Sequence, residues 1–290
     1  MDSAHPANAA AVPATRPDAP AHSPADIVLD LSQRVRSVVD DPERALNSIR
    51  VRPQAIEGVF ETLDSRVCSE STIAEAIGSD PIFTCRLLRL TNSRFFDGDQ
   101  RLVNVDQAVH RAGPTTIRAL TGRVFSDSRT ASDPPPGFIE HAHRAAKGCE
   151  LMAARVDVPN GLAHVAGLIH DLGRALLAQA APEDNRRLTE AFGEDTRDLR
   201  DHEVATFGIS HDQLAGAATR QWGFPEEFCA AIERHHFIPP ESTPLDQVVL
   251  GGHALAQLAE GDGDEVQLET TLQFAGVSSS EAAKLVAAID

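Results

Sequence analysis

Apolar residues along most of this chain recur at intervals of three and four, the spacing that gathers them on one face of an α-helix. The first such run contains Ile27, Leu31 and Val35, and similar runs continue to about residue 260. The alternation of apolar and polar residues that is typical of half-buried β-strands is scarce. The sequence therefore predicts an all-α fold.

Residues that favour helix starts accompany these runs. Asp80 precedes Pro81, which predicts an N-cap followed by a proline at the first helical position. We expect the replacement of Asp80 with alanine to cost about 1 kcal/mol of stability through loss of this cap. Near the end of the chain, Ser278 and Glu281 have the spacing of a capping box.

The second half of the chain predicts several longer helices. One extends from about residue 138 to 156, and another from about 162 to 180, with only Gly167 and Gly173 as weak points. Further helices are predicted over residues 183–192, 199–207, 211–222, 225–236 and 245–258. In the first half, Gly113-Pro114 predicts the end of a helix.

Composition suggests where the chain divides. Residues 1–25 contain nine alanines and five prolines, which predicts a disordered leader because little apolar surface can be buried. The proline-rich stretch before residue 138 suggests a boundary between an N-terminal lobe over 26–131 and a second lobe over 132–260. Two small helices over 261–290 form an extension that we expect to close the core.

The charge balance limits the classes of partner. The chain has 26 basic and 43 acidic residues, a formal net charge of −17. Such a chain lacks the basic footprint needed to bind nucleic acid or an anionic membrane, but it can accept a cationic partner or a metal. The chain lacks the run of about 20 apolar residues that spans a bilayer, and it lacks a secretory signal pattern. We therefore expect a cytoplasmic protein.

The four cysteines are Cys68, Cys85, Cys149 and Cys229. None of them belongs to a CxxC motif, and each lies in an apolar stretch with helical spacing. Free cysteine in such a context behaves as a small apolar residue. We expect four buried, reduced thiols, as in a reducing cytosol.

Histidine is the residue type that most suggests chemistry. Nine of the 12 histidines lie between His141 and His253. His170 and Asp171 are adjacent within an apolar, helical stretch, where a polar pair costs several kcal/mol unless it has partners. A divalent metal is one candidate partner, since imidazole and carboxylate both bind such ions. A hydrogen-bonded pair in the core is the alternative.

Other histidines lie near the predicted ends of helices. His141 is near the start of one helix, His211 opens another, and His235 and His236 end a third. Side chains from several helix ends can converge on one site. For the paired histidines alone, a solvated helix C-terminus stabilised by the helix dipole is the alternative.

The order of these residues resembles the HDOD (HD-related output domain) family of the HD superfamily. Four segments carry the resemblance, and together they cover about residues 30–260: residues 77–96 (IGSDPIFTCRLLRLTNSRFF), 103–113 (VNVDQAVHRAG), 166–177 (AGLIHDLGRALL) and 207–236 (FGISHDQLAGAATRQWGFPEEFCAAIERHH). The resemblance implies a helical N-terminal lobe packed on an HD-like lobe. It also implies a regulatory output or scaffold role in bacterial signal transduction, generally without an established catalytic activity.

The resemblance also implies a set of metal ligands. In this sequence the matching residues are His141, His170 and Asp171, the additional ligands His211, His235 and His236, and His253 in place of the family's distal aspartate. The implied cofactor is a divalent metal, either Fe, Mn, Zn or Mg. Two departures weaken the case for cyclic di-GMP hydrolysis: the Gly-Tyr-Pro signature after the paired histidines is missing, and Arg174 replaces a lysine.

Three functions remain open at this point. The first is a non-catalytic signalling module with a degenerate metal site, read by a signalling protein partner. The second is a metal-dependent phosphohydrolase acting on a nucleotide or cyclic dinucleotide, with Asp171 and Arg174 as catalytic candidates and Arg174 or Arg144 neutralising phosphate. The third is a sensor that binds metal or nucleotide without turnover.

Overall fold

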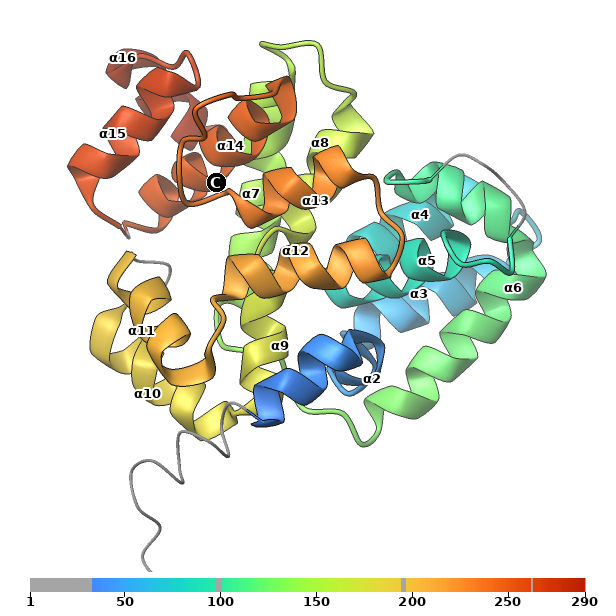
Figure 1. The fold of residues 1–290 in the computed structure, drawn as a ribbon. Helices are drawn as coiled ribbons and strands as arrows, with labels where there is room; N and C mark the ends of the chain where they lie inside the picture. The colour runs from blue at the N-terminus through green and yellow to red at the C-terminus, as the bar shows by residue number, and fades with distance from the viewer. Residues whose placement is uncertain (1–32, 97–100, 194–196, 262, 290) are drawn as a thin grey trace, which may run out of the picture.

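The computed structural model describes residues 33–96, 101–193, 197–261 and 263–289. Over these residues the regular structure is helical, apart from one isolated bridge between Ile49 and Ser132. The predicted all-α fold is therefore confirmed (Figure 1). The predicted leader over residues 1–25 lies outside the described residues.

The helices of the expected N-terminal lobe pack largely against α6, its longest helix. After a helical stretch over residues 33–40, its elements are α2 (Pro42–Asn47), α3 (Pro53–Asp64), α4 (Glu70–Gly78), α5 (Pro81–Thr91) and α6 (Val105–Ser128). Asp80 is the N-cap of α5, as predicted, and its Oδ1 accepts a hydrogen bond from Phe83 N at 2.9 Å. The predicted stop at Gly113-Pro114 is a kink within α6, where Gly113 has a φ of 69°.

A buried arginine ties α5 to its neighbours. Arg86 is 1% exposed, and its Nη2 donates to the carbonyl oxygens of Leu46 and Ile49 at 3.1 and 3.0 Å. Its Nη1 lies 3.4 Å from Asp127 on α6. Burial lowers the pKa of Arg86 to about 10, although Asp127 opposes this shift. This cation therefore joins α5 to the end of α2 and to α6.

The second lobe is built on close contacts of α7 with α8 and α14. Its helices are α7 (Phe138–Ala153), α8 (Asn160–Ile169), α9 (Leu172–Ala180), α10 (Pro182–Phe192), α11 (Arg197–Phe207), α12 (His211–Gln221), α13 (Glu226–Glu233) and α14 (Pro244–Glu260). Gly148 on α7 faces Gly252 on α14. A Cβ added at Gly148 would lie 2.5 Å from Gly252 O, so glycine permits this close approach.

The prediction of one continuous helix over residues 162–180 is wrong. The chain turns at His170 and Asp171, between α8 and α9. Gly167 and Gly173 lie within the helices and serve packing instead. A Cβ at Gly173 would lie 1.8 Å from His211 O, and one at Gly167 would lie 2.5 Å from Ala145 O. The backbone contact at Gly173 brings α9 against the start of α12.

The extension forms α15 (Glu265–Phe274) and α16 (Ser279–Val286), which pack on α14 (Figure 1). Leu268 and Leu272 are buried there in a second apolar cluster that includes Cys149 and Met152 of α7. The extension thus closes one side of the second lobe, as expected. The predicted capping box between Ser278 and Glu281 is present.

The prediction of four buried thiols is correct for three cysteines. Cys85, Cys149 and Cys229 are buried, and burial raises the pKa of each thiol. Cys68 is exposed in the segment between α3 and α4, so the interpretation of that stretch as helix was wrong. Among the described residues, no helix is long and apolar enough to span a bilayer.

Candidate metal centre

Asp171 lies at the centre of a buried group of histidines. Its carboxylate is 1% exposed, and its two oxygens face different partners. Oδ2 lies 3.7 Å from His141 Nε2 and 3.9 Å from His170 Nε2. Oδ1 lies 3.3 Å from His235 Nε2 and 3.6 Å from His211 Nε2. One carboxylate therefore joins two sets of imidazoles.

The first set consists of His141, His170 and His253, contributed by α7, the end of α8 and α14. His170 Nε2 lies 3.3 Å from His141 Nε2 and 3.0 Å from His253 Nδ1. All three side chains are buried. Three widely separated parts of the chain thus bring ring nitrogens to one point.

The second set consists of Asp171, His211, His235 and His236. His211 is the first residue of α12, and its Nε2 lies 2.7 Å from His236 Nε2. The helix predicted to reach residue 236 ends at Glu233, which leaves His235 and His236 in the turn that follows α13. The turn lets both rings reach the site. Within each set, one potential ligand atom per residue lies within 4.8 Å of the others.

Backbone carbonyl groups orient two of the rings. His170 Nδ1 lies 2.7 Å from Gly167 O, and His235 Nδ1 lies 2.6 Å from Ile232 O. A carbonyl oxygen can only accept, so Nδ1 carries the proton in each ring. In the neutral imidazole the inward-facing Nε2 is then a lone-pair donor, the form that binds a metal.

Two glutamates orient two further rings. His141 Nδ1 lies 2.8 Å from Glu260 Oε2 at the end of α14. His211 Nδ1 lies 2.7 Å from Glu203 Oε2 on α11, and the same oxygen accepts from His211 N at 2.9 Å. A carboxylate behind a ligating imidazole raises the basicity of the ring and fixes its orientation.

These residues fit a divalent metal. Inward-facing lone pairs on neighbouring rings repel one another unless a proton or a cation lies between them. His235 Nε2 is buried and makes no hydrogen bond in the described structure. Six imidazoles and one carboxylate suit Zn, Mn or Fe better than Mg, which prefers oxygen ligands.

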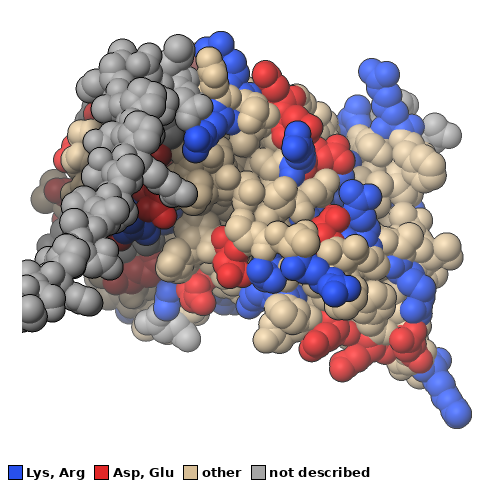
Figure 2. Space-filling model, turned by 90° about the horizontal axis from the view of Figure 1, so that it is seen from below, with Lys and Arg blue, Asp and Glu red and all other residues tan. Residues whose placement is uncertain are grey.

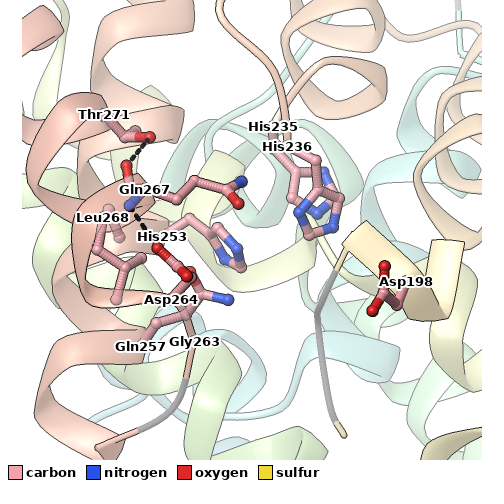
Figure 3. Close-up of a pocket in the computed structure, with 11 residues that line it drawn as sticks. Asp198, His235, His236, His253, Gln257, Gly263, Asp264, Gln267, Leu268 and Thr271 are labelled. Atoms are coloured by element: carbon pink, nitrogen blue, oxygen red, sulfur yellow. Dashed lines mark hydrogen bonds between the residues drawn. The ribbon is translucent and has the colours of Figure 1, made fainter. Parts of the chain in front are cut away.

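A cavity of about 290 Å³ adjoins the centre. His235, His236 and His253 line it from one side (Figure 3). Its other walls are Asp198 of α11, Ala254 and Gln257 of α14, and Gly263, Asp264, Gln267, Leu268 and Thr271 at or near α15. No lysine or arginine is among the described residues that line it.

The two candidate phosphate-binding arginines face carboxylates of the centre. Arg174 is 5% exposed, and its Nη1 donates to Asp171 Oδ2 at 3.2 Å. Arg144 Nη1 donates to Glu260 Oε1 at 3.2 Å. The structure therefore directs both guanidinium groups to the acidic partners of the histidines, and neither lines the cavity.

The family follows from sequence comparison. The model of the HDOD domain matches residues 32–238. The chain belongs to the HDOD family. The HDOD match contains six of the seven clustered residues and ends before α14, so His253 and Glu260, which contacts the His141 ring, lie beyond it.

Curated relatives of this HDOD protein are distant. An uncharacterized protein of Treponema pallidum is 26% identical over 244 residues, which are 78% of this chain and 46% of that protein. A ribonuclease Y of Desulfotalea psychrophila is 27% identical over 161 residues, 56% of this chain and 26% of the relative. The chain thus spans less than half the length of these relatives.

Solved structures share the fold. The MmoQ response regulator of Methylococcus capsulatus has a TM-score of 0.67 at 20% identity, covering 83% of this chain and 98% of that one. A virulence factor of Campylobacter jejuni has a TM-score of 0.64 at 14% identity, covering 89% and 96%. At these identities the likeness concerns the HDOD fold alone.

The structure brings together all seven residues that the family resemblance implied as ligands. Sequence reasoning missed the two glutamates behind the rings, Glu203 and Glu260. It also missed Asp212, which receives hydrogen bonds from Arg200 at 2.7 and 3.1 Å. Burial by itself would raise the pKa of Asp212, but Arg200 and the neighbouring imidazoles hold it well below its ordinary value. This ion pair fixes the start of α12, where His211 lies.

Proposed function

We propose that this HDOD protein is a regulatory module of bacterial signal transduction that holds divalent metal at the Asp171 centre and does not hydrolyse phosphodiesters. The observation that carries the proposal is the position of Asp171, with one oxygen facing each set of imidazoles. A cytoplasmic location and a signalling protein partner belong to the same proposal.

Bound metal would supply Lewis acidity at this point, and the chain would hold it from five places: α7, the α8–α9 turn, the start of α12, the turn after α13, and α14. These elements are far apart in sequence. Bound metal would therefore stabilise the packing of these elements against one another. A partner protein could then distinguish the metal-bound module from the metal-free one.

The acidic cavity supports a role without hydrolysis. Asp198 and Asp264 line it, whereas the candidate phosphate-binding arginines are engaged elsewhere. Among the described residues that line the cavity, a phosphodiester would meet two carboxylates and no lysine or arginine, so that any attraction would have to come from metal bound at the neighbouring histidines. The protein side chains at the cavity therefore favour a role other than phosphodiester binding.

A metal-dependent phosphodiesterase is the second candidate. Two sets of ligands joined by one carboxylate are the kind of arrangement used by two-metal hydrolases. Two of the curated relatives carry the name ribonuclease Y. The matched segment covers 26% of the first of these proteins and 33% of the second.

One experiment separates these functions. The purified protein, loaded in turn with Mn, Fe or Zn, is analysed for metal by mass spectrometry and assayed with bis(p-nitrophenyl) phosphate. We expect bound metal in the wild type, loss of it in Asp171→Asn and His170→Ala, and retention in His110→Ala, an exposed histidine of the other lobe. We expect no turnover.

Two results would contradict the proposal. Protein that stays metal-free under all loading conditions would remove the metal centre. Hydrolysis that depends on metal and is abolished in Asp171→Asn would replace the regulatory role with the phosphodiesterase.

A further inference from the structure

The mouth of the cavity carries acidic groups from two separate helices. Asp198 lies on α11, and Asp264 lies across the cavity at the start of α15 (Figure 3). Asp264 Oδ1 caps α15 by accepting from Gln267 N at 2.9 Å. Behind them lies the imidazole of His235, 1% exposed, whose Nε2 makes no hydrogen bond in the described structure. The mouth of the cavity thus carries negative charge from two aspartates.

The charge of the surrounding lobe has the same sign. Residues 138–290 contain 11 basic and 25 acidic residues, whereas residues 33–137 contain 14 of each. The excess negative charge of residues 33–290 therefore belongs to the part of the chain that holds the cavity. A field of this kind attracts a cationic partner and repels a nucleotide.

Exposed apolar side chains occur on α11, which carries Asp198, and on the turn that follows the paired histidines. Phe237 and Ile238, which directly follow the paired histidines, are 44% and 39% exposed, and Val204 on α11 is 45% exposed. Arg200 of α11 lies over the Phe237 ring, 5.6 Å from its centroid, so α11 and this turn are in contact. Val204 is about 9 Å along α11 from Asp198 and about 120° around the helix axis from it, so a docked segment would have to bend around α11 to reach both.

We propose that this surface docks a segment of a partner protein in which an arginine or lysine is flanked by apolar residues. The basic side chain enters the cavity between Asp198 and Asp264. The apolar neighbours pack on Val204, Phe237 and Ile238. The inference rests on the proposed function, because it names the kind of partner that would read the module.

A protein segment fits these observations better than a small cation or a nucleic acid. Exposed apolar residues beside a charged pocket are typical of protein interfaces, where apolar anchors supply affinity and charge supplies selectivity. A small cation would leave the apolar surface uncovered, and a nucleic acid would be repelled. Asp264 lies beyond residue 238, the end of the family match, so part of the surface lies outside the matched segment.

The test uses fluorescence anisotropy with labelled peptides of one design: a central arginine between leucine and phenylalanine residues. Two matched peptides replace the arginine with glutamate, or the apolar residues with serine. We expect the wild type to bind the arginine peptide and to discriminate against both others. Binding should weaken as salt rises from 50 to 500 mM, since the mouth is solvent-exposed.

Variants separate the two parts of the surface. Asp198→Asn with Asp264→Asn should weaken binding of the arginine peptide about fivefold, and asparagine retains the cap of α15. Phe237→Ser should weaken the arginine peptide and leave the serine peptide unchanged. Glu57→Gln with Glu61→Gln removes two exposed charges from α3 in the other lobe and serves as the matched control.

The outcomes distinguish this inference from the proposed function. Equal binding of the glutamate peptide, displacement of the arginine peptide by GMP, or a double aspartate variant that behaves like the α3 control would overturn the docking surface. Metal content is measured on the same samples. Arginine selectivity in a metal-free protein would contradict the metal centre alone, whereas a loaded protein without selectivity would contradict the docking surface alone.

Discussion

The two lobes bury charged groups in opposite ways. In the N-terminal lobe, the Arg86 guanidinium donates to carbonyl groups of α2 and its vicinity and pairs with Asp127. In the second lobe, Asp171 is surrounded by imidazole nitrogens that face one another as well as the carboxylate. In the first case every acceptor faces a donor, whereas in the second Arg174 donates to Asp171 but several imidazole nitrogens still face one another. The first arrangement completes a fold, whereas the second invites a cation.

The surfaces of the lobes differ as well. Residues 33–137 are neutral overall, whereas residues 138–290, which comprise most of the second lobe and the extension, carry a net charge of −14 from 11 basic and 25 acidic residues. Where described residues are visible on the face shown in Figure 2, basic and acidic side chains are interspersed. The difference in net charge between the two parts of the chain is therefore a difference in residue counts, and it does not appear as one acidic patch on this face.

The largest effect is expected at Arg86. Replacement by alanine removes hydrogen bonds to Leu46 O and Ile49 O and leaves Asp127 without this partner. We expect a loss of about 4 kcal/mol, measured by urea denaturation. Metal content of the folded fraction should stay unchanged. A loss of metal in that fraction would mean that Arg86, although it lies in the other lobe, also supports the metal centre.

The next effect concerns metal itself. With free metal at about one hundred times its Kd, the wild type should gain about 2.7 kcal/mol of stability. The Asp171→Asn variant should gain no stability from added metal, because the carboxylate shared by the two histidine sets is lost. The measurement is the urea midpoint with Zn, Mn or EDTA. Equal stabilisation of the two proteins would show that metal binds outside the Asp171 centre.

A smaller effect is expected at Asp80, the other buried charge of the N-terminal lobe. Its carboxylate accepts from Phe83 N and also from Arg52 N, both at 2.9 Å. Loss of the second bond adds to the loss of the cap, so Asp80→Ala should cost about 2 kcal/mol. Ser69→Ala, at the half-buried N-cap of α4, should cost about 0.5 kcal/mol. Equal costs would contradict a role for Arg52 N.

The smallest effect involves Glu281 in the exposed capping box of α16. Hydrogen bonds from Ser278 and the nearby Arg155 lower the pKa of Glu281 from 4.5 to about 2. A lowered pKa means that the folded state favours the carboxylate, so this stabilisation is present above pH 4.5 and is lost as the pH falls toward 2. The difference in stability between wild type and Glu281→Gln should shrink over that range. A stability difference that stays constant over this pH range would contradict the lowered pKa of Glu281.

Local signals predicted much of the fold. Caps such as Asp80 and the Ser278–Glu281 box depend on neighbours in sequence, and the structure has both. The turn at His170 could not be predicted in this way. The glycines on either side suggested breaks, yet they permit backbone contacts with helices distant in sequence. Periodicity carries no information on such contacts.

The site was predicted through family resemblance, and only in part through local pattern. His170-Asp171 stood out as a polar pair in an apolar stretch. Glu203 and Glu260 gave no comparable signal, because each is one of 43 acidic residues and its role depends on a ring brought close by the fold. Residues that orient ligands become recognisable only once the helices are assembled.

The contact between Gly148 and Gly252 has a consequence for the centre. Gly252 precedes His253, and Gly148 lies two helical turns from His141 on the same helix. The spacing of α7 and α14, which carry these two ligands, is therefore set largely by main chain in contact with main chain, with the Cys149 side chain packed beside it. A single methyl group added at either glycine would push α7 and α14 apart, and with them His141 and His253.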